Sequence, residues 1–176
     1  MPPIVEPLLT TTMIQERMRI LSEEITPRLQ PDVLMVTLMN GAFFFGADLA
    51  RMLSSQGCRL TLDFLVMSSY GAGTVSSGTI TTRLDVRTPL NNRQVLLIDD
   101  ILDTGLTLQT ASRHLVAKGA AEVLTCVLLD KPARRKVGIQ ADFVGFEIPN
   151  LFVVGYGIDY NEQYRELPFV GHIRTP

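Results

Sequence analysis

The segment VLLIDDILDTGLTLQTA, from Val95 to Ala111, concentrates side chains that can carry out chemistry. An apolar run leads into two adjacent acids, Asp99 and Asp100, a third acid follows at Asp103, and residues 104–107 read Thr-Gly-Leu-Thr at the expected start of a helix. A helix N-terminus offers free backbone N–H groups to a phosphate, and a glycine lets the phosphate approach the backbone. Acids beside a phosphate repel it unless they face away, toward hydroxyl groups or a hard cation such as Mg²⁺. The segment therefore predicts a site for a phosphorylated, polyhydroxylated small molecule.

A simpler interpretation of the same segment is structural. Thr104 would cap the helix, and the acids would complement the helix dipole. That interpretation suffices for any one residue, but three acids and two threonines within nine positions favour a ligand site. The chain contains no GxxxxGK[ST], GxSxG or HExxH motif, and its two histidines, His114 and His172, form no obvious constellation.

Apolar periodicity predicts the elements that must position this segment. Helices are expected over about 10–27, 44–55 and 106–118, and strands over 33–38, 60–67, 79–84, 95–98, 123–129, 143–144 and 152–154. Strands separated by helices predict an α/β fold with a mostly parallel sheet covered on both faces, and ligands bind such sheets at the carboxyl ends of the strands. A signalling receiver domain also has an acidic pair after an apolar strand, but there it follows the first strand, and here it lies past mid-chain.

Composition limits the class of protein. The 176 residues are 46% hydrophobic and 19% charged with a formal net charge of −2, which predicts one globular domain over 1–176 and a small-molecule partner rather than nucleic acid. No apolar run approaches the roughly 20 residues that cross a bilayer. The two cysteines, Cys58 and Cys126, lie far apart, and the first basic residue is Arg17, so we expect reduced thiols, no secretory signal and a cytoplasmic protein.

The motif LLIDDILDTGLTL closely resembles the phosphoribosyl diphosphate motif of type I phosphoribosyltransferases. Four further segments resemble the hypoxanthine-guanine phosphoribosyltransferases, in the expected order: LMNGAFFF (38–45), SSYGAGTVSSG (68–78), LLDKP (128–132) and DFVGFEIPNLFVVGYGIDYNEQYR (142–165). The resemblance implies a parallel sheet flanked by helices over about 30–150 and a small hood made by the N-terminal segment and about 150–176. It also implies a mobile lid that carries Ser69 and Tyr70.

The resemblance implies purine salvage as the function. Ribose 5-phosphate passes from phosphoribosyl diphosphate to N9 of hypoxanthine or guanine, with Mg²⁺ present, giving IMP or GMP and pyrophosphate through an oxocarbenium-like state. A homodimer or homotetramer is expected on the same ground. Two alternatives stay open, a xanthine-preferring enzyme and a non-catalytic nucleotide-sensing regulator on the same fold.

The resemblance assigns roles on the phosphate and ribose side of the site. Asp103 contacts purine N7 and is the expected general base. The 5′-phosphate loop consists of Asp103, Thr104, Gly105, Leu106 and Thr107. Asp99 and Asp100 hold the ribose hydroxyls and, with Asp159, the metal. The acid at 99 is Asp where Glu is common in relatives, which shortens its reach by one methylene.

On the base side, the resemblance makes Lys131 the donor to the purine 6-oxo group, Phe152 the ring that stacks on the base, and Val153 a backbone contact. Asp159 also lies near the purine 2-position. Taken without the resemblance, Lys131 is more simply a solvated surface cation and Phe152 a core residue.

On the pyrophosphate side, the resemblance assigns Asn40, Gly41 and Arg165 as ligands. Relatives can carry a cis peptide in the loop that matches Asn40-Gly41, and many have Lys in place of Asn40. The local alternative for Asn40-Gly41 is an ordinary turn, and that for Asp159 and Arg165 is a surface ion pair.

Overall fold

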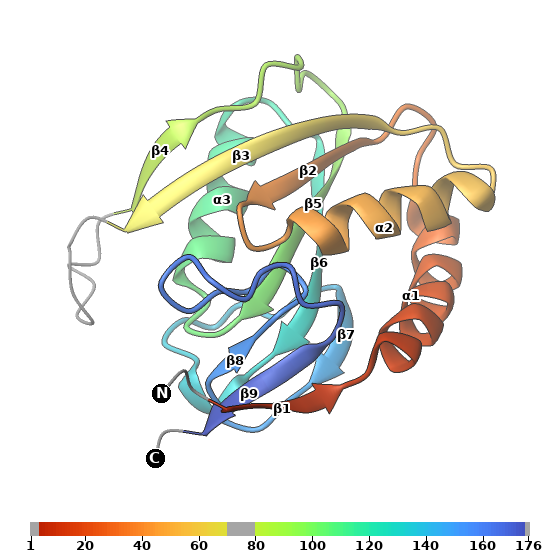
Figure 1. Ribbon diagram of the computed structural model, residues 1–176. Coiled ribbons are helices and arrows are strands. Elements are labelled where there is room, and N and C mark those ends of the chain that lie inside the picture. Colours follow the sequence, from red (N-terminus) through yellow and green to blue (C-terminus); the bar gives the residue numbers. More distant parts are fainter. Residues whose placement is uncertain (1–3, 70–79, 175–176) are drawn as a thin grey trace.

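The computed structural model describes residues 4–69 and 80–174 and contains two sheets (Figure 1). The larger sheet has six strands in the order β4-β3-β2-β5-β6-β7. Its neighbouring strands are parallel except for β3 and β4, which are antiparallel. The strands span Leu34–Met39 (β2), Thr61–Ser69 (β3), Ile80–Leu84 (β4), Gln94–Leu102 (β5), Glu122–Asp130 (β6) and Phe143–Glu147 (β7).

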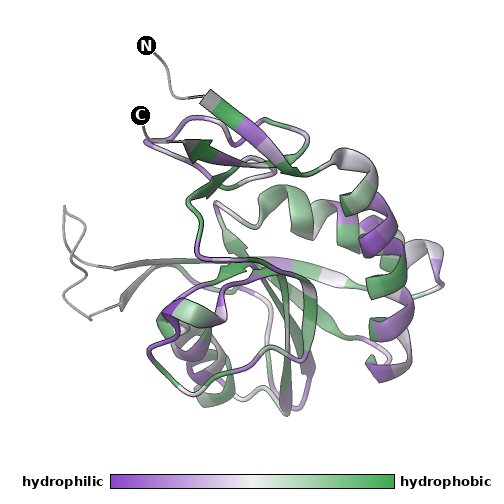
Figure 2. Ribbon diagram, turned by 90° about the horizontal axis from the view of Figure 1, so that it is seen from below, coloured by the Kyte–Doolittle hydropathy of each residue, from purple (hydrophilic) through white to green (hydrophobic). Residues whose placement is uncertain are grey.

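Helices cover both faces of this sheet, as the alternation of strands and helices predicts. Helices α1 (Thr11–Ile25) and α2 (Phe43–Ser55) lie on one face and α3 (Leu106–Ala117) on the other. Side chains of a strand alternate between the two faces. Accordingly, Met35 of β2 belongs to the core with α1 and α2, whereas Leu34 and Val36 belong to the core with α3. Figure 2 shows apolar residues along the large sheet and a mixture of polar and apolar residues along α1.

A second, small sheet joins the two ends of the chain. It has the antiparallel order β1-β9-β8, with β1 at Ile4–Leu9, β9 at Val170–Arg174 and β8 at Val153–Val154. Neither β1 nor β9 is predicted from the sequence. Pro7 obscures the strand pattern of β1, and it is tolerated because β1 is an edge strand that pairs with β9 alone.

The main helices and strands agree with the predicted ones to within a few residues, with one informative difference in β5. The sequence predicts a strand that ends at Ile98, before the acidic pair. In the structure β5 continues to Leu102, because Asp99, Ile101 and Leu102 keep their register with β6. The two acids therefore belong to the strand itself, which fixes their backbone. Tyr70 and the rest of the expected lid lie outside the described residues, and Ser69 is the last residue of β3.

Parallel pairing brings the carboxyl ends of β2, β3, β5 and β6 to one edge of the large sheet. That edge faces the small sheet (Figure 1).

Among the described residues, no helix is long and apolar enough to cross a membrane.

Candidate active site

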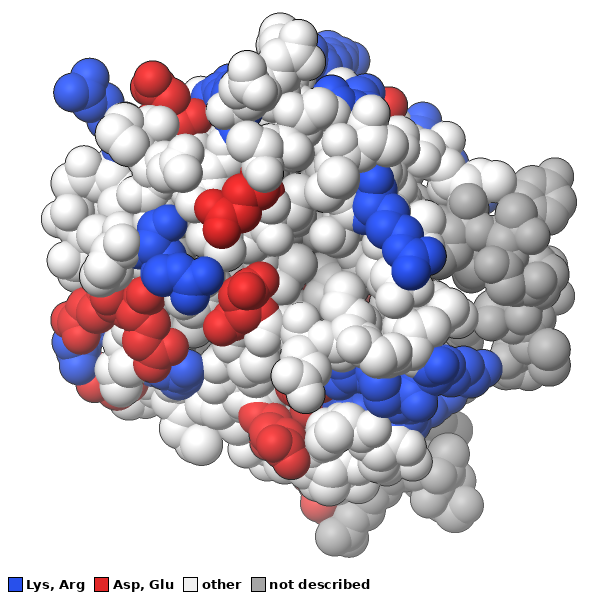
Figure 3. All heavy atoms as spheres, turned by 180° about the vertical axis from the view of Figure 1, so that it is seen from behind, with Lys and Arg blue, Asp and Glu red and all other residues white. Residues whose placement is uncertain are grey.

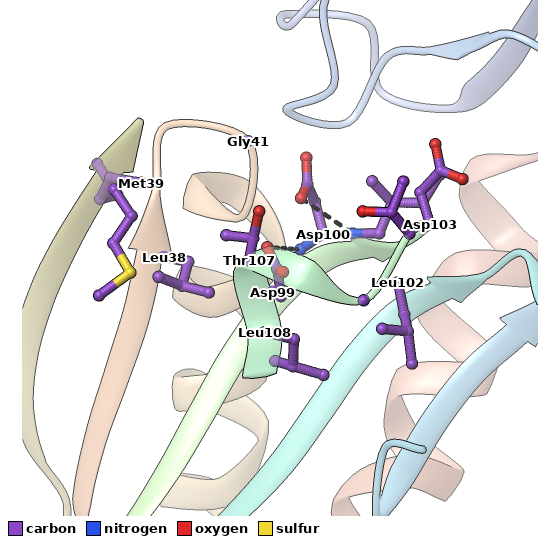
Figure 4. A pocket seen from close by; sticks show the side chains of 13 residues that line it. Leu38, Met39, Gly41, Asp99, Asp100, Leu102, Asp103, Thr107 and Leu108 are labelled. Atoms are coloured by element: carbon purple, nitrogen blue, oxygen red, sulfur yellow. Dashed lines mark hydrogen bonds between the residues drawn. The ribbon is translucent and has the colours of Figure 1, made fainter. Parts of the chain in front are cut away.

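The acidic pair lies at the end of β5, at the edge of a cavity of about 250 Å³. Asp99 is 6% exposed, and its Oδ1 accepts a hydrogen bond of 3.0 Å from the backbone N–H of Asp100 (Figure 4). Oδ1 of Asp100 in turn accepts one of 2.9 Å from the N–H of Ile101. Burial raises the pKa of both carboxyls, and the negative charge of Asp100 raises that of Asp99 further. The fold therefore disfavours the charged forms of both carboxyls relative to water.

The predicted phosphate loop continues from this strand into α3. Gly105 caps the helix with a φ of 83°, in the left-handed region that glycine adopts readily. A Cβ at this position would lie 2.7 Å from Ile139 Cγ2 and 2.9 Å from Val137 Cγ2. Thr104, Gly105 and Thr107 line the cavity together with Asp103. The first turn of α3, in which the N–H of Leu106 donates to Oγ1 of Thr104 at 3.4 Å, thus adjoins the same cavity as the acids.

Arg135 supports the loop from behind, a role that the sequence analysis does not identify. Its Nε donates to the backbone oxygen of Asp103 at 3.2 Å, its Nη1 donates to that of Ile139 at 2.8 Å, and it is ion-paired with Asp130. The backbone N–H of Lys136 also donates to the oxygen of Thr104 at 2.9 Å. The sequence shows these cations only as a short RRK cluster after Lys131, a pattern typical of a solvated surface.

Asp103, the first residue of the phosphate loop, interacts with two cations, Arg134 and Lys131. Nη1 of Arg134 is 3.3 Å from its Oδ2, while its Oδ1 is buried and has no hydrogen-bond partner among the described residues. In Figure 4 the carboxylates of Asp100 and Asp103 point away from the sheet, whereas Leu102 and Leu108 point toward its core.

Lys131 is buried, so its interpretation as a solvated surface cation is wrong. The side chain is 5% exposed, and its Nζ donates to the backbone oxygen of Leu151 at 2.9 Å. Burial lowers the pKa of Lys131, against the opposing effect of the negative charge of Asp103. A buried ammonium is a stronger donor than a neutral group toward any acceptor within its reach.

The other base-side residues lie in β8 of the small sheet and on either side of it. The Phe152 ring is 55% exposed, which contradicts its interpretation as a core residue, and it contacts the ring of Tyr160 edge to face at 5.5 Å. Val153 is buried in β8. Oδ1 of Asp159 is 2.9 Å from Nη2 of Arg165. Phe152 thus offers a free aromatic face, and Arg165 is already oriented by a carboxylate.

The loop after β2 closes the site from the opposite side. The peptide bond between Met39 and Asn40 is cis. A Cβ on Gly41 would overlap the carboxylate of Asp100, and one on Gly157 would overlap the backbone oxygen of Gly41. Nη1 of Arg165 donates to the oxygen of Gly157 at 2.8 Å. Close packing at these two glycines therefore brings together the end of β2, the end of β5 and the segment that contains Arg165.

The comparisons with known proteins agree with this geometry. A family model described as "phosphoribosyl transferase domain" matches residues 9–161. The hypoxanthine-guanine phosphoribosyltransferase of Bacillus subtilis is 41% identical over 168 residues, which cover 95% of this chain and 92% of the relative. The enzyme of that name from Aquifex aeolicus is 44% identical over 165 residues, covering 93% and 91%.

Solved structures give the same result. The crystal structure of a hypoxanthine phosphoribosyltransferase from Staphylococcus aureus is 38% identical, has a TM-score of 0.89 and covers 96% of this chain and 91% of the other. A mutant of the Trypanosoma cruzi hypoxanthine phosphoribosyltransferase, in a ternary substrates complex, is 35% identical with a TM-score of 0.89, covering 98% and 96%. The chain belongs to the phosphoribosyl transferase domain family and, within it, is similar to the hypoxanthine-guanine phosphoribosyltransferases.

Proposed function

We propose that the chain transfers ribose 5-phosphate from phosphoribosyl diphosphate to N9 of hypoxanthine or guanine, giving IMP or GMP and pyrophosphate. The observation that carries this proposal is that Asp103, Thr104, Gly105 and Thr107 line one cavity, while the buried Lys131 lies near enough to Asp103 for the negative charge to act on its pKa. The names of the most similar relatives, which are hypoxanthine-guanine or hypoxanthine phosphoribosyltransferases, support the same substrates.

The proposed roles follow from the position and chemistry of each group. The N–H groups at the start of α3 and the hydroxyls of Thr104 and Thr107 bind the 5′-phosphate. Asp103 accepts the proton from N7 of the base as a general base. Lys131 donates to the 6-oxo group, which discriminates against adenine because a 6-amino group cannot accept. Phe152 stacks on the base.

On the opposite side, Asn40, Gly41 and Arg165 bind pyrophosphate. Asn40 supplies no charge where many relatives have Lys, so Arg165 becomes the main fixed cation on that side. The segment 69–78, with Ser69 and Tyr70, serves as the lid. The small sheet, with the residues around it, serves as the hood of a single domain over 1–176.

Mg²⁺ fits the acids at the end of β5. Hard carboxylate oxygens are its preferred protein ligands, and it commonly binds one or two of them together with substrate phosphates. Burial raises the pKa of Asp99 and Asp100, so the fold disfavours their charged forms, and a bound cation would offset that effect. Asp159, the third proposed ligand, is ion-paired with Arg165. Within the described ranges, no group of three or more His, Cys, Asp or Glu converges on one point. When bound, Mg²⁺ neutralises charge on the pyrophosphate leaving group.

Two alternatives remain as outcomes of the assay. A xanthine-preferring enzyme would differ in what the backbone around Val153 and Asp159 offers to the purine 2-position. A nucleotide-sensing regulator would bind the ligands without turnover. A regulator that binds nucleic acid requires a basic surface, whereas Figure 3 shows acidic and basic side chains interspersed on the face that it draws.

The test is an initial-rate assay with phosphoribosyl diphosphate, Mg²⁺ and one base at a time: hypoxanthine, guanine, xanthine or adenine. We expect turnover of hypoxanthine and guanine and none of adenine. Faster turnover of xanthine than of hypoxanthine would replace the proposed specificity. Retained binding of phosphoribosyl diphosphate with no turnover of any base would favour the regulator, and salt-dependent binding to a polynucleotide would then test for a nucleic-acid partner.

We further propose a homodimer or homotetramer. Leu62 and Phe64 lie two apart on β3, and Leu84 pairs with Val66, so all three side chains share one face of the sheet. They are 53%, 43% and 40% exposed, and exposed apolar patches mark interfaces. Light scattering at micromolar concentration should show an oligomer that Phe64→Lys dissociates. A monomeric natural sequence would contradict this proposal.

A cytoplasmic location is proposed as well. Cys58 and Cys126 are both free thiols in the structure, and Cys126 is buried. Free thiols persist in reducing compartments. Fractionation of the cells that make the protein would test this directly.

A further inference from the structure

Arg134 shares one tight turn with Lys131, beside the carboxylate of Asp103. The turn is a 3₁₀-helix over Pro132–Arg134, and the N–H of Arg134 donates to the backbone oxygen of Lys131 at 3.3 Å. Residues three apart in such a turn lie on the same side. Nη1 of Arg134 is 3.3 Å from Oδ2 of Asp103. The proposed base and the proposed 6-oxo donor are thus joined by a second cation that neither role accounts for.

The two oxygens of the Asp103 carboxylate have unequal surroundings. Oδ2 faces Arg134, whereas Oδ1 is buried and has no hydrogen-bond partner among the residues described. A buried acceptor without a donor is unfavourable. In the free protein, Oδ1 is therefore an unsatisfied acceptor on a side chain that lines the cavity.

The backbone of Asp103 is fixed independently of this contact. Nε of Arg135 donates to its backbone oxygen at 3.2 Å, and the following loop is bound to Lys136 through Thr104. Rotation of the side chain is the freedom that remains to Asp103. Arg134 is the charged group placed to limit that rotation.

We propose that Arg134 is a positioning residue for Asp103. It binds Oδ2, orients the carboxylate, and reserves Oδ1 for the proton on N7 of the base. This inference rests on the proposed function. Arg134 acts through Asp103 and leaves the phosphate loop unchanged, so its loss should lower turnover and leave the binding of phosphoribosyl diphosphate intact.

The test compares Arg134→Gln, Arg134→Lys and the control Arg113→Gln, which removes an arginine on α3. We expect Arg134→Gln to lower kcat/KM for hypoxanthine about 10-fold to 100-fold, the size of effect that a misoriented catalytic group produces. KM for phosphoribosyl diphosphate should stay within about twofold of the value for the protein of natural sequence. Arg134→Lys should recover most of the loss because it restores a cation near Oδ2. All variants should melt within a few degrees of the natural sequence, since a half-exposed ion pair contributes little to stability.

A double-mutant cycle separates this role from a merely structural one. In an Asp103→Asn background, measured by single turnover at high enzyme concentration, Arg134→Gln should cause no further loss. Losses that multiply in the double variant, or full activity of Arg134→Gln alone, would overturn the positioning role. If the natural sequence and Arg113→Gln both fail to convert any 6-oxopurine, the proposed function itself fails and the positioning role falls with it.

Discussion

The phosphate side and the base side of the site are built in different ways. On the phosphate side, five consecutive residues, 103–107, run from the end of β5 into the first turn of α3, and the proposed binding groups are mostly backbone N–H groups. On the base side, the proposed ligands come from separate segments: the side chain of Lys131 at the end of β6, and Phe152, Val153 and Asp159 in and around β8. The phosphate side therefore depends on backbone conformation, whereas the base side depends on functional groups. Substitutions on the two sides should fail in different measurements.

Asp103→Asn tests the residue where the two sides meet, and we expect the largest effect there. Loss of a general base lowers turnover by roughly 10²-fold to 10⁴-fold. Asparagine keeps the size of the side chain and the backbone of the loop, so the affinity for phosphoribosyl diphosphate should be retained. Calorimetric titration with that ligand and steady-state kcat would show the split. Turnover equal to that of the natural sequence would remove the general-base assignment.

Gly105→Ala tests the dependence of the phosphate side on backbone conformation. A non-glycine residue at a φ of 83° is strained, and its Cβ would crowd Val137 and Ile139. Such strain costs about 1–3 kcal/mol, so KM for phosphoribosyl diphosphate should rise at least several-fold. Gly138→Ala is the matched control, because a Cβ there would meet open space. Equal kinetics of the two alanine variants would show that the loop tolerates the change and would weaken the comparison.

Lys131→Met tests the dependence of the base side on a functional group. Removal of a charged donor should lower kcat/KM for hypoxanthine about 10-fold to 100-fold, equivalent to a hydrogen bond of about 1.5–3 kcal/mol to a charged group. Burial lowers the pKa of Lys131, so its charged form is disfavoured in the fold, and the apolar replacement should not lower the melting temperature. KM for phosphoribosyl diphosphate is the control measurement. An increase in that KM alone would place Lys131 on the phosphate side.

Asp99→Asn should have the smallest effect, measured here on stability in the absence of Mg²⁺ and substrate, so that the proposed ligand role of Asp99 does not enter. Burial raises the pKa of Asp99 above its ordinary value of 3.8, so the folded protein favours the protonated carboxyl. The protonated Asp99 carboxyl therefore stabilises the folded protein fully below the ordinary pKa, and this stabilisation is lost as pH rises through the raised pKa. Asparagine keeps an acceptor for the Asp100 N–H and does not ionise. We expect it to melt on the order of 2–4 °C above the natural sequence near neutral pH without Mg²⁺.

The decisive feature of the Asp99→Asn measurement is its dependence on pH. The difference in melting temperature should shrink as the solution is acidified, because the natural carboxyl then takes up a proton. A variant that melts lower than the natural sequence near neutral pH would show that Asp99 is stabilising as an anion.

The sequence predicts the local parts of this molecule well and the assembled parts less well. The position of the phosphate loop follows from one contiguous motif. The positions of the three helices and of most strands along the chain follow from periodicity. The small sheet does not, because β1 and β9 pair across the length of the chain and β9 also pairs with β8. The burial of Lys131 and the exposure of Phe152 depend on neighbours distant in the sequence, which local pattern does not specify. Without the family resemblance, both would be misassigned.

The pairing of β1 with β9 has a consequence for biosynthesis. Residues 4–9 lie beside residues 170–174, so β1 leaves the ribosome long before its partner β9 has been made. Contacts between distant positions form late in folding. The phosphate side, built from neighbouring β5 and α3, can assemble earlier during translation. A nascent chain would thus be able to hold a phosphate before it can select a base.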